Sequence, residues 1–562
     1  MQKIYFSLIL FSLVSFQKGF SQWVSNTTIN TPVAVANSWQ IDLRMCDDGH
    51  KGVFMVWKDY RNGAPDIYAQ HLDSLGVPKW TLNGVPVCTN SADQSTPAII
   101  SDMNGGVIIA WSDWRSQIER DLYAQRLDQN GSPLWALNGV VVTNLNEREH
   151  NERLVTDEMG GAYVVFEKQN PSNGYRWEVW MQRINGNGNT LWQPGGIKLS
   201  LTTGEFLNPR IQKDGKGGAV ITWQDFRNGL DYDVYAQRVG PSGNLKWGST
   251  ALKVCNANGG QTNPKIDPDS ASGGVIISWT DMRNGIDYDI YAQKIDSSGN
   301  LLWGTNGTAV CTAIGNQSAV DILSNPRVNG SIFTWKDMRN GQYDIYTQKL
   351  NGSGIAQWTN NGVVISNATG DQLNPNITGD NNGGAVIVWQ DMRTGNYDVM
   401  AQRISKNGVI LWANNGVPVS TAIGNQTSPK NVSDVEGGSI FAWEDNRSGN
   451  PDIYAHKIFY DGFNVGTSYE NYLADFNLFP NPADNHINLN FLLLNETEIE
   501  IKLFDALGNE IYFKKDSESK VNFQPGNHQY EIDLSQLCFS RGIYFVKISG
   551  AAFSKTVRFI KE

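Results

Sequence analysis

The sequence lacks any excess of basic residues. It has 45 Lys and Arg against 56 Asp and Glu, which gives a formal net charge of −11. We see no stripe of Lys and Arg that would reverse this balance locally. An acidic surface repels phosphate backbones, so we expect no nucleic acid partner.

Long apolar runs are also scarce. The main one spans residues 4–16 and is too short to cross a membrane. A lysine precedes it, and the small residues Gly19 and Ser21 follow it, which predicts a signal peptide over residues 1–21. We therefore expect an exported protein that has no transmembrane segment.

Cysteine is rare, with five residues in the chain. Cys88, Cys255 and Cys311 occupy the same place in three copies of an internal repeat, and such positions are too far apart for disulfide bonds. The cysteine spacings do not indicate a zinc site, and no calcium loop of the EF-hand type is present. We expect buried thiols, and neither a metal nor a cofactor.

Glycine and tryptophan are abundant by contrast, with 56 and 19 residues. Both belong to an internal repeat that recurs about every 55 residues. Each copy splits into four strand-length pieces separated by Gly-rich turns, which is typical of one blade of a β-propeller. A Trp-x-Asp-x-Arg landmark begins at Trp57, Trp111, Trp223, Trp279, Trp335, Trp389 and Trp443, with an eroded copy at Phe166.

The landmarks also predict how the repeats close. An Asp-x-Tyr-x-Gln type of motif follows every Trp-x-Asp-x-Arg, whereas a Gly-x-x-x-Trp motif is missing from the last copy. Trp23 precedes residues 33–35 much as Trp80 precedes residues 85–87, so the N-terminal segment is predicted to supply the missing outer strand. We predict an all-β fold, with an eight-bladed β-propeller over residues 22–465 closed by an N-terminal strand. An open solenoid is the alternative.

The repeat stops near Val465, and residues 466–475 are predicted to form a linker. Residues 476–562 contain short alternating segments separated by turns, which predicts a small Ig-like β-sandwich.

Several motifs occur in order within this last segment. They are Phe479-Pro480-Asn481-Pro482, Phe504-Asp505 with Gly508, Ile532-Asp533-Leu534 and Gly542-Ile543-Tyr544. The segment closely resembles the type A C-terminal sorting domain of the type IX secretion system of Bacteroidota. The resemblance implies the type IX secretion machinery as a partner, export across the outer membrane and removal of this domain. We therefore expect a secreted protein, extracellular or attached to the outer cell surface.

The repeated Asp, Arg, Tyr and Trp do not predict a catalytic site. A catalytic residue is needed once, so we expect the repeated Asp to accept turn N–H groups and the Arg to pair with it. Stretches such as residues 73–80 resemble the Asp-box of sialidase-type propellers and the tryptophan-docking motif of quinoprotein dehydrogenases. Neither pattern is complete, so the resemblance implies a propeller without implying an activity.

The second and third copies depart from the repeat and hold the candidate binding residues. Charged and aromatic side chains gather in their loops, and such side chains suit a sugar or a peptide. The candidates are Trp114, Arg120, Glu147, Arg148, His150, Glu152, Arg153, Arg176 and Trp177. The alternative is a drifted copy with a solvated charged loop. The spacing does not support Glu147 and Glu152 as an acid–base pair, and His150 is a weaker base candidate still.

Three functions therefore stay open. The first is a non-enzymatic secreted or surface-attached propeller that binds a glycan or a protein. The second is a glycoside hydrolase or lyase that acts on polysaccharide, with its site near the second and third copies. The third is a purely structural surface protein. The absence of a catalytic pattern favours the first function over the second.

Overall fold

The computed structural model describes residues 23–145, 147–269, 273–325, 330–462, 473–493, 497–505, 510–512, 521–524, 526–535, 540–550 and 553–561. The predicted signal peptide, most of the predicted linker and Cys538 lie outside these residues.

Within the described part of residues 23–462, the strands form eight antiparallel sheets of four strands each. Four of them are β2–β5 (Gln40–Asp47, Val53–Asp59, Asp66–Leu72, Val85–Cys88), β6–β9 (Gln94–Ser101, Val107–Asp113, Asp121–Leu127, Val140–Thr143), β10–β13 (Glu149–Thr156, Ala162–Asn170, Arg176–Ile184, Ile197–Lys198) and β14–β17 (Phe206–Lys213, Ala219–Asp225, Asp233–Val239, Leu252–Cys255). Three more are β18–β21 (Gln261–Asp269, Gly274–Asp281, Asp289–Ile295, Thr308–Cys311), β22–β25 (Gln317–Asn325, Gly330–Asp337, Asp344–Asn351, Val363–Ser366) and β26–β29 (Gln372–Gly379, Ala385–Asp391, Asp398–Ile404, Val417–Ser420). A short 3₁₀ helix, Pro171–Asn173, lies between β11 and β12.

The eighth sheet joins the two ends of this region. Its strand order is β1, β32, β31, β30. Their bounds are Thr31–Ala34, Asp452–Ile458, Ser439–Asp445 and Gln426–Ser433. β1 pairs antiparallel with β32, and Thr31 lies opposite Ala455. The predicted N-terminal strand of the last sheet is thus confirmed.

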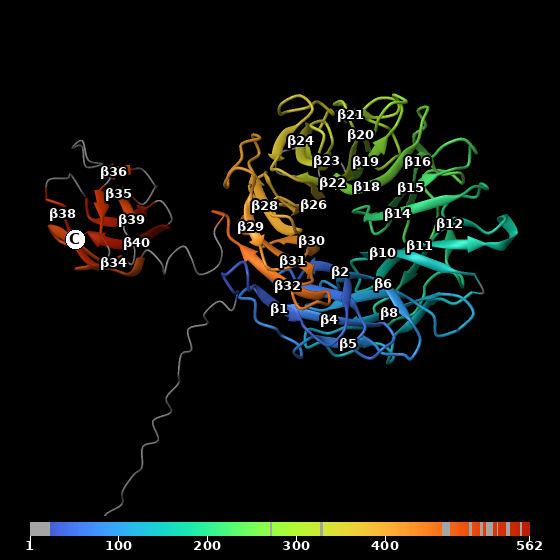
Figure 1. Cartoon of the computed structure of the whole chain (residues 1–562), viewed down its shortest axis with the longest axis horizontal. Helices are drawn as coiled ribbons and strands as arrows, with labels where there is room; N and C mark the ends of the chain where they lie inside the picture. Colours follow the sequence, from blue (N-terminus) through green and yellow to red (C-terminus); the bar gives the residue numbers. More distant parts are fainter. Residues whose placement is uncertain are drawn as a thin grey trace, which may run out of the picture.

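The sheets stand side by side around a common centre (Figure 1). The first strand that follows each connection lies nearest that centre, and we call these the inner strands. They are β2, β6, β10, β14, β18, β22, β26 and β30. Each inner strand contacts the next one in this series, and β30 contacts β2 in turn. The series of contacts therefore has no open end.

The Trp-x-Asp-x-Arg landmark is part of the scaffold. Trp57 Nε1 donates a 2.8 Å hydrogen bond to Asp59, and the backbone N–H of Arg61 donates to the same carboxylate at 2.9 Å. The Arg61 guanidinium also pairs with Asp59 and lies 4.0 Å from the ring centre of Tyr68. The bond from the tryptophan to the aspartate recurs in six further sheets, at Trp111, Trp223, Trp279, Trp335, Trp389 and Trp443. The expectation that the aspartate accepts turn N–H groups and pairs with the arginine is confirmed.

The outer tryptophans connect neighbouring sheets. Trp80 Nε1 donates a 3.0 Å hydrogen bond to the carbonyl oxygen of Gln129 in the next sheet. Its indole also covers Gly131, which has a φ of +79° and where an added Cβ would lie 2.9 Å from the ring. Glycine is therefore required there. The same arrangement in other sheets explains why glycine and tryptophan are both abundant.

The C-terminal strands form two further sheets. One contains β33 (Leu473–Phe479), β34 (His486–Leu493) and β38 (Gly526–Asp533). The other contains β35 (Thr497–Asp505), β36 (Glu510–Tyr512), β37 (Val521–Phe523), β39 (Gly542–Gly550) and β40 (Phe553–Lys561). Ile487, Phe491 and Leu503 help to form one core between the sheets. β33 begins three residues before the predicted start of this domain, because Leu473 already pairs with Leu493.

Candidate functional site

In the third sheet, β10–β13, the hydrogen bonds that the landmark tryptophan, aspartate and arginine make in the other sheets are replaced by a different set of contacts. Phe166 stands where the other sheets have the landmark tryptophan, and Trp180 lies opposite it. Lys168 stands where the others have aspartate. Its ammonium lies 3.2 Å from the Glu147 carboxylate and 4.2 Å from the ring centre of Trp180. Trp180 Nε1 in turn donates to the buried Glu178 at 3.2 Å. The altered copy is therefore packed and internally paired.

Five candidate residues gather at the start of β10, and we call them the face cluster. They are Trp114, Arg120, Arg148, His150 and Trp177. The His150 and Trp177 rings meet edge-on with centroids 4.2 Å apart, and the Arg148 guanidinium lies 5.8 Å from the Trp177 ring. Arg120 lies 5.9 Å from the ring of Trp114. Trp114 and Arg148 are exposed, whereas the other three are half-buried.

His150 is a neutral member of this cluster. Burial is the main reason why its pKa falls to about 4, and the positive charges of Arg148, Arg120 and Arg153 lower it further. Its Nε2 lies 3.4 Å from Glu167. At neutral pH the imidazole is uncharged, so it offers one hydrogen-bond donor and one acceptor.

The structure does not bring Glu147 and Glu152 together as a ligand-facing pair. Glu147 pairs with Lys168. Glu152 is fully buried and accepts hydrogen bonds from Thr96 Oγ1 at 2.9 Å and Ser112 Oγ at 3.2 Å, both on the neighbouring sheet. Burial holds the Glu152 carboxylate away from the surface, and its role as a ligand contact stays a prediction.

Two further candidates neighbour the face cluster: Arg176 precedes Trp177 in the chain, and the charge of Arg153 helps to lower the pKa of His150. Arg176 is exposed at the first position of β12. Arg153 lies further along β10, beyond a β-bulge, and its guanidinium donates to the carbonyl oxygen of Glu152 at 2.7 Å.

Glu149 occupies a position that glutamine holds in six other inner strands, at Gln40, Gln94, Gln261, Gln317, Gln372 and Gln426. Glu149 is fully buried. Burial is the main reason why its pKa rises to about 9, although Thr143 Oγ1 donates to it at 3.1 Å. At neutral pH Glu149 is a protonated carboxyl that stands in for the glutamine side chain.

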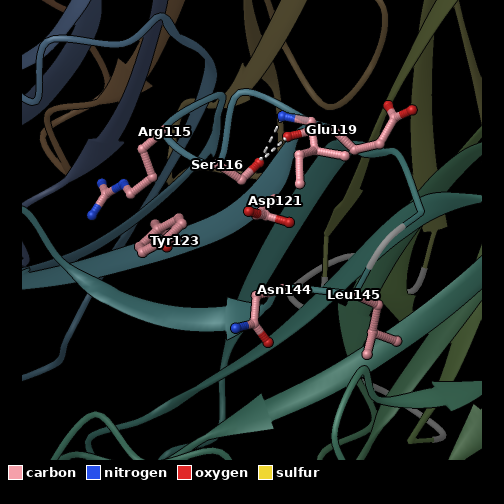
Figure 2. Close-up of a pocket in the computed structure, with 8 residues that line it drawn as sticks. Arg115, Ser116, Glu119, Asp121, Tyr123, Asn144 and Leu145 are labelled. Atoms are coloured by element: carbon pink, nitrogen blue, oxygen red, sulfur yellow. Dashed lines mark hydrogen bonds between the residues drawn. The ribbon is translucent and has the colours of Figure 1, made fainter.

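A cavity of about 210 Å³ lies between the β7–β8 loop and the segment after β9, and the five face-cluster residues are not among those that line it. Arg115, Glu119, Asp121 and Leu145 are among its lining residues. Figure 2 shows the Glu119 carboxylate pointing away from Asp121. Burial raises the pKa of Asp121 to about 6, and nearby Asp113 and Glu119 charges add to this effect. The cavity walls do not present two converging carboxylates.

A second group of charged residues was missed by the sequence reasoning, apart from Arg153. We call this group the axial cations. Each is the fifth residue of an inner strand, and they are Arg44, Arg153, Arg210, Lys265 and Lys430. An alignment of the inner strands from their first residue would have shown that they share one position.

The cysteines and the possible metal-ligand side chains of the described residues do not point to a further site. Cys88, Cys255 and Cys311 are free and buried, and burial raises the pKa of each thiol to about 12. Within the described ranges, no group of three or more His, Cys, Asp and Glu side chains is placed to hold a metal ion. Over the same residues, no helix has the length and apolar character of a membrane span.

Solved structures similar to this chain include several carbohydrate-active enzymes. An ulvan lyase of family PL25 is 9% identical, with a TM-score of 0.41, and the match covers 66% of this chain and 95% of that one. An endo-arabinase from Bacteroides thetaiotaomicron is 15% identical, with a TM-score of 0.28 and coverages of 47% and 97%. An α-L-arabinofuranosidase from Lactobacillus brevis is 9% identical, with a TM-score of 0.29 and coverages of 49% and 95%. These activities belong to those proteins alone.

No curated protein matches the chain. One family model matches its C-terminal part, over residues 477–562, and describes a secretion system C-terminal sorting domain. The match covers the strands from β34 to β40 and the last three residues of β33. Residues 477–562 are therefore a type IX C-terminal sorting domain, and the protein that carries it is secreted, extracellular or attached to the outer cell surface.

Proposed function

We propose that residues 22–465 form a closed eight-bladed β-propeller, that residues 1–21 are a signal peptide and that the C-terminal sorting domain is an Ig-like sandwich. The contact series that returns from β30 to β2 supports a closed ring. The pairing of β1 with β32 supports closure by the N-terminal strand. The pairing of β1 covers the edge of β32, and the short outer strands leave only short sheet edges at the circumference, which protects a secreted protein from edge-to-edge aggregation.

We propose that this propeller binds an extracellular glycan at the face cluster. The observation that carries the proposal is the partly exposed Trp177 ring, with His150 edge-on to it and Arg148 close by. An aromatic ring offers a large apolar face, and the neighbouring guanidinium groups and neutral imidazole supply hydrogen bonds. The β7–β8 loop, which carries Trp114 and Arg120, also lines a cavity of about 210 Å³.

The acidic residues favour binding over hydrolysis. A hydrolase of the common glycoside type needs two carboxyl groups that face one scissile bond. Glu147 is paired with Lys168, and Glu152 is buried against Thr96 and Ser112. Glu119 points away from Asp121 in the neighbouring cavity (Figure 2). None of these arrangements offers an acid and a base to the same ligand.

A glycan array tests the proposal with three forms of the secreted protein: wild type, Trp177→Ala and Trp39→Ala. Trp39 is a matched control, because it is 51% exposed and lies outside the face cluster. We expect Trp177→Ala to weaken glycan binding by about tenfold or more, as loss of a central aromatic contact does. We expect Trp39→Ala to bind as the wild type does. Equal binding by all three proteins, or no glycan bound by the wild type, would reject the site.

A further inference from the structure

Every inner strand contains a β-bulge that directs one of its side chains. In β2, the pairing with β3 shifts between Ile41 and Arg44, and Asp42 has a left-handed φ of 58°. The same shift precedes the fifth residue in each of the other inner strands. β-Bulges redirect side chains and are built features of a sheet. The fifth residue therefore has the same position, directly after the bulge, in every inner strand.

These fifth residues are mostly basic. In chain order they are Arg44, Ala98, Arg153, Arg210, Lys265, Asp321, Asn376 and Lys430. The inner strands surround the centre of the ring, and β6 and β10 stand between β2 and β14 (Figure 1). The charge of Arg44 on β2 nevertheless helps to lower the pKa of Arg210 on β14, after burial as the main cause. Side chains that influence one another across intervening strands converge toward the axis.

Four of the axial cations lack an acidic partner. Arg44, Arg153 and Arg210 each donate from Nη1 to the preceding backbone carbonyl, at 2.9, 2.7 and 2.8 Å. Across the part of the chain that the structure describes, no carboxylate forms an ion pair with these three or with Lys430. The fifth cation, Lys265, lies 3.3 Å from a carboxylate oxygen of Asp321.

The carboxylates near this group have other partners. Asp321 accepts a 2.6 Å hydrogen bond from Asn376 Nδ2 in addition to its contact with Lys265. Glu167 accepts a 2.6 Å hydrogen bond from the backbone N–H of Asn208. Glu444 accepts a 3.4 Å backbone hydrogen bond from β2. These bonds hold the acidic groups in place while the guanidinium groups keep free N–H donors.

We propose that Arg44, Arg153 and Arg210 form an oxyanion-binding site on the axis of the ring, with Lys430 beside them. The planar guanidinium group matches the oxygens of sulfate, phosphate and carboxylate groups in a two-pronged contact. The positive charges of the axial cations repel one another, the nearby carboxylates of Asp321, Glu167 and Glu444 offset this only in part, and a bound anion reduces the repulsion that remains. The anion is either a free ion or a sulfate or carboxylate group on an acidic glycan. This site is separate from the face cluster and does not depend on glycan binding there.

Calorimetric titration of the secreted protein with sodium sulfate at constant ionic strength tests the proposal. We expect sulfate to bind the wild type and to bind about tenfold or more weakly after Arg210→Gln, because a charge-assisted contact is lost. Lys253→Gln, which removes an exposed charge on β17 outside both proposed sites, is the matched control and should leave sulfate binding unchanged. A sulfated oligosaccharide that displaces sulfate identifies an acidic glycan as the source, and failure to displace it identifies the free ion. No sulfate binding, or equal binding by Arg210→Gln, would overturn the proposal.

Thermal unfolding separates a binding role from a structural one. If Arg210 serves to bind an anion, Arg210→Gln relieves repulsion, so the variant melts at or above the wild-type temperature in sulfate-free buffer. The same variant then loses the extra stabilisation that sulfate gives the wild type. A variant that melts lower and keeps the full sulfate effect would show that Arg210 is structural, and would overturn the proposal. Both results are read without any glycan, so they are independent of the face-cluster experiment.

Discussion

Trp23 Nε1 donates a 3.0 Å hydrogen bond to the carbonyl oxygen of Ser74, although the strand that follows Trp23 belongs to the eighth sheet. The Trp23 indole also lies against Gly76, where an added Cβ would come within 2.7 Å of the ring. Trp80 makes the same pair of contacts with Gln129 and Gly131 one sheet further on. Trp23 thus connects the eighth sheet to β2–β5 in the way that the other tryptophans connect their neighbours.

Trp23→Ala should destabilise the whole ring. The substitution removes the buried indole from the junction between the eighth sheet and the sheet β2–β5. Replacing a buried tryptophan by alanine typically costs about 3–5 kcal/mol. The free energy of unfolding, measured by denaturant titration, should fall by that amount. Trp39→Ala is the control, because Trp39 is 51% exposed, and it should change stability little. Equal stability of Trp23→Ala and Trp39→Ala would contradict closure through Trp23.

Glu149→Gln should stabilise the protein at neutral pH. The Glu149 pKa is about 9 in the folded chain, whereas an unfolded glutamate ionises near its usual value. Between these two values the folded state binds more protons, so the wild type loses stability as the pH rises through this window. The glutamine side chain of the variant does not titrate, so the variant should gain about 3 kcal/mol over the wild type at pH 7.

Unfolding titrations at pH 4, 5.5 and 7 check this prediction. The difference between Glu149→Gln and the wild type should grow with pH and be smallest at pH 4. Glu158→Gln is a suitable control, because Glu158 is exposed and makes only a surface pair with Lys213. A difference that does not depend on pH would mean that Glu149 is already ionised in the folded protein.

The repeated parts of the fold could be predicted from the sequence because each landmark makes the same contacts in several sheets. Trp57, Asp59 and Arg61 bond to one another within a few residues, so their roles follow from local spacing. The motifs put the C-terminal domain at residue 476, one residue before the family match begins, whereas β33 begins at Leu473, whose pairing with Leu493 lies outside any motif.

The candidate site could be predicted only in part. His150 and Trp177 were expected together and do meet. The side chain of Glu152 was expected at the surface, but it follows the left-handed residue Asn151 in a β-bulge and is buried. No local pattern shows which way a bulge turns a side chain. The axial cations were missed because they come together only when strands from distant copies surround one centre.

Sulfate binding at the axis should weaken as the pH rises from 7 to 9. Burial is the main reason why the Lys430 pKa falls to about 8, and Lys265 and Arg44 lower it further. Lys430 therefore loses its positive charge within this range, whereas sulfate keeps its charge throughout. We expect roughly tenfold weaker binding at pH 9 in the wild type. Asp321 and Glu444 act on Lys430 in the opposite direction, and burial lowers the Arg153 pKa to about 9. Lys430→Arg keeps the charge at this position, so its sulfate affinity should fall less than that of the wild type over the same range.

Removal of residues 477–562 should stop export without unfolding the repeat region. Those residues are the sorting domain, and the eight four-stranded sheets lie within residues 31–458. The truncated protein should accumulate in the periplasm and be absent from the medium and the cell surface.

The location and the folding of the truncated protein have to be measured together. Immunoblots of cell fractions report where it is, and its melting temperature reports whether the sheets remain intact. A truncated protein that stays in the periplasm and melts as the repeat region of the full chain does would show that residues 477–562 act as a sorting signal. Normal release would contradict this assignment, since another segment would then direct export. Retention with a much lower melting temperature would instead mean that the C-terminal sheets stabilise the repeat region. We do not expect this result, because the C-terminal sheets have a core of their own buried side chains, such as Ile487 and Phe491.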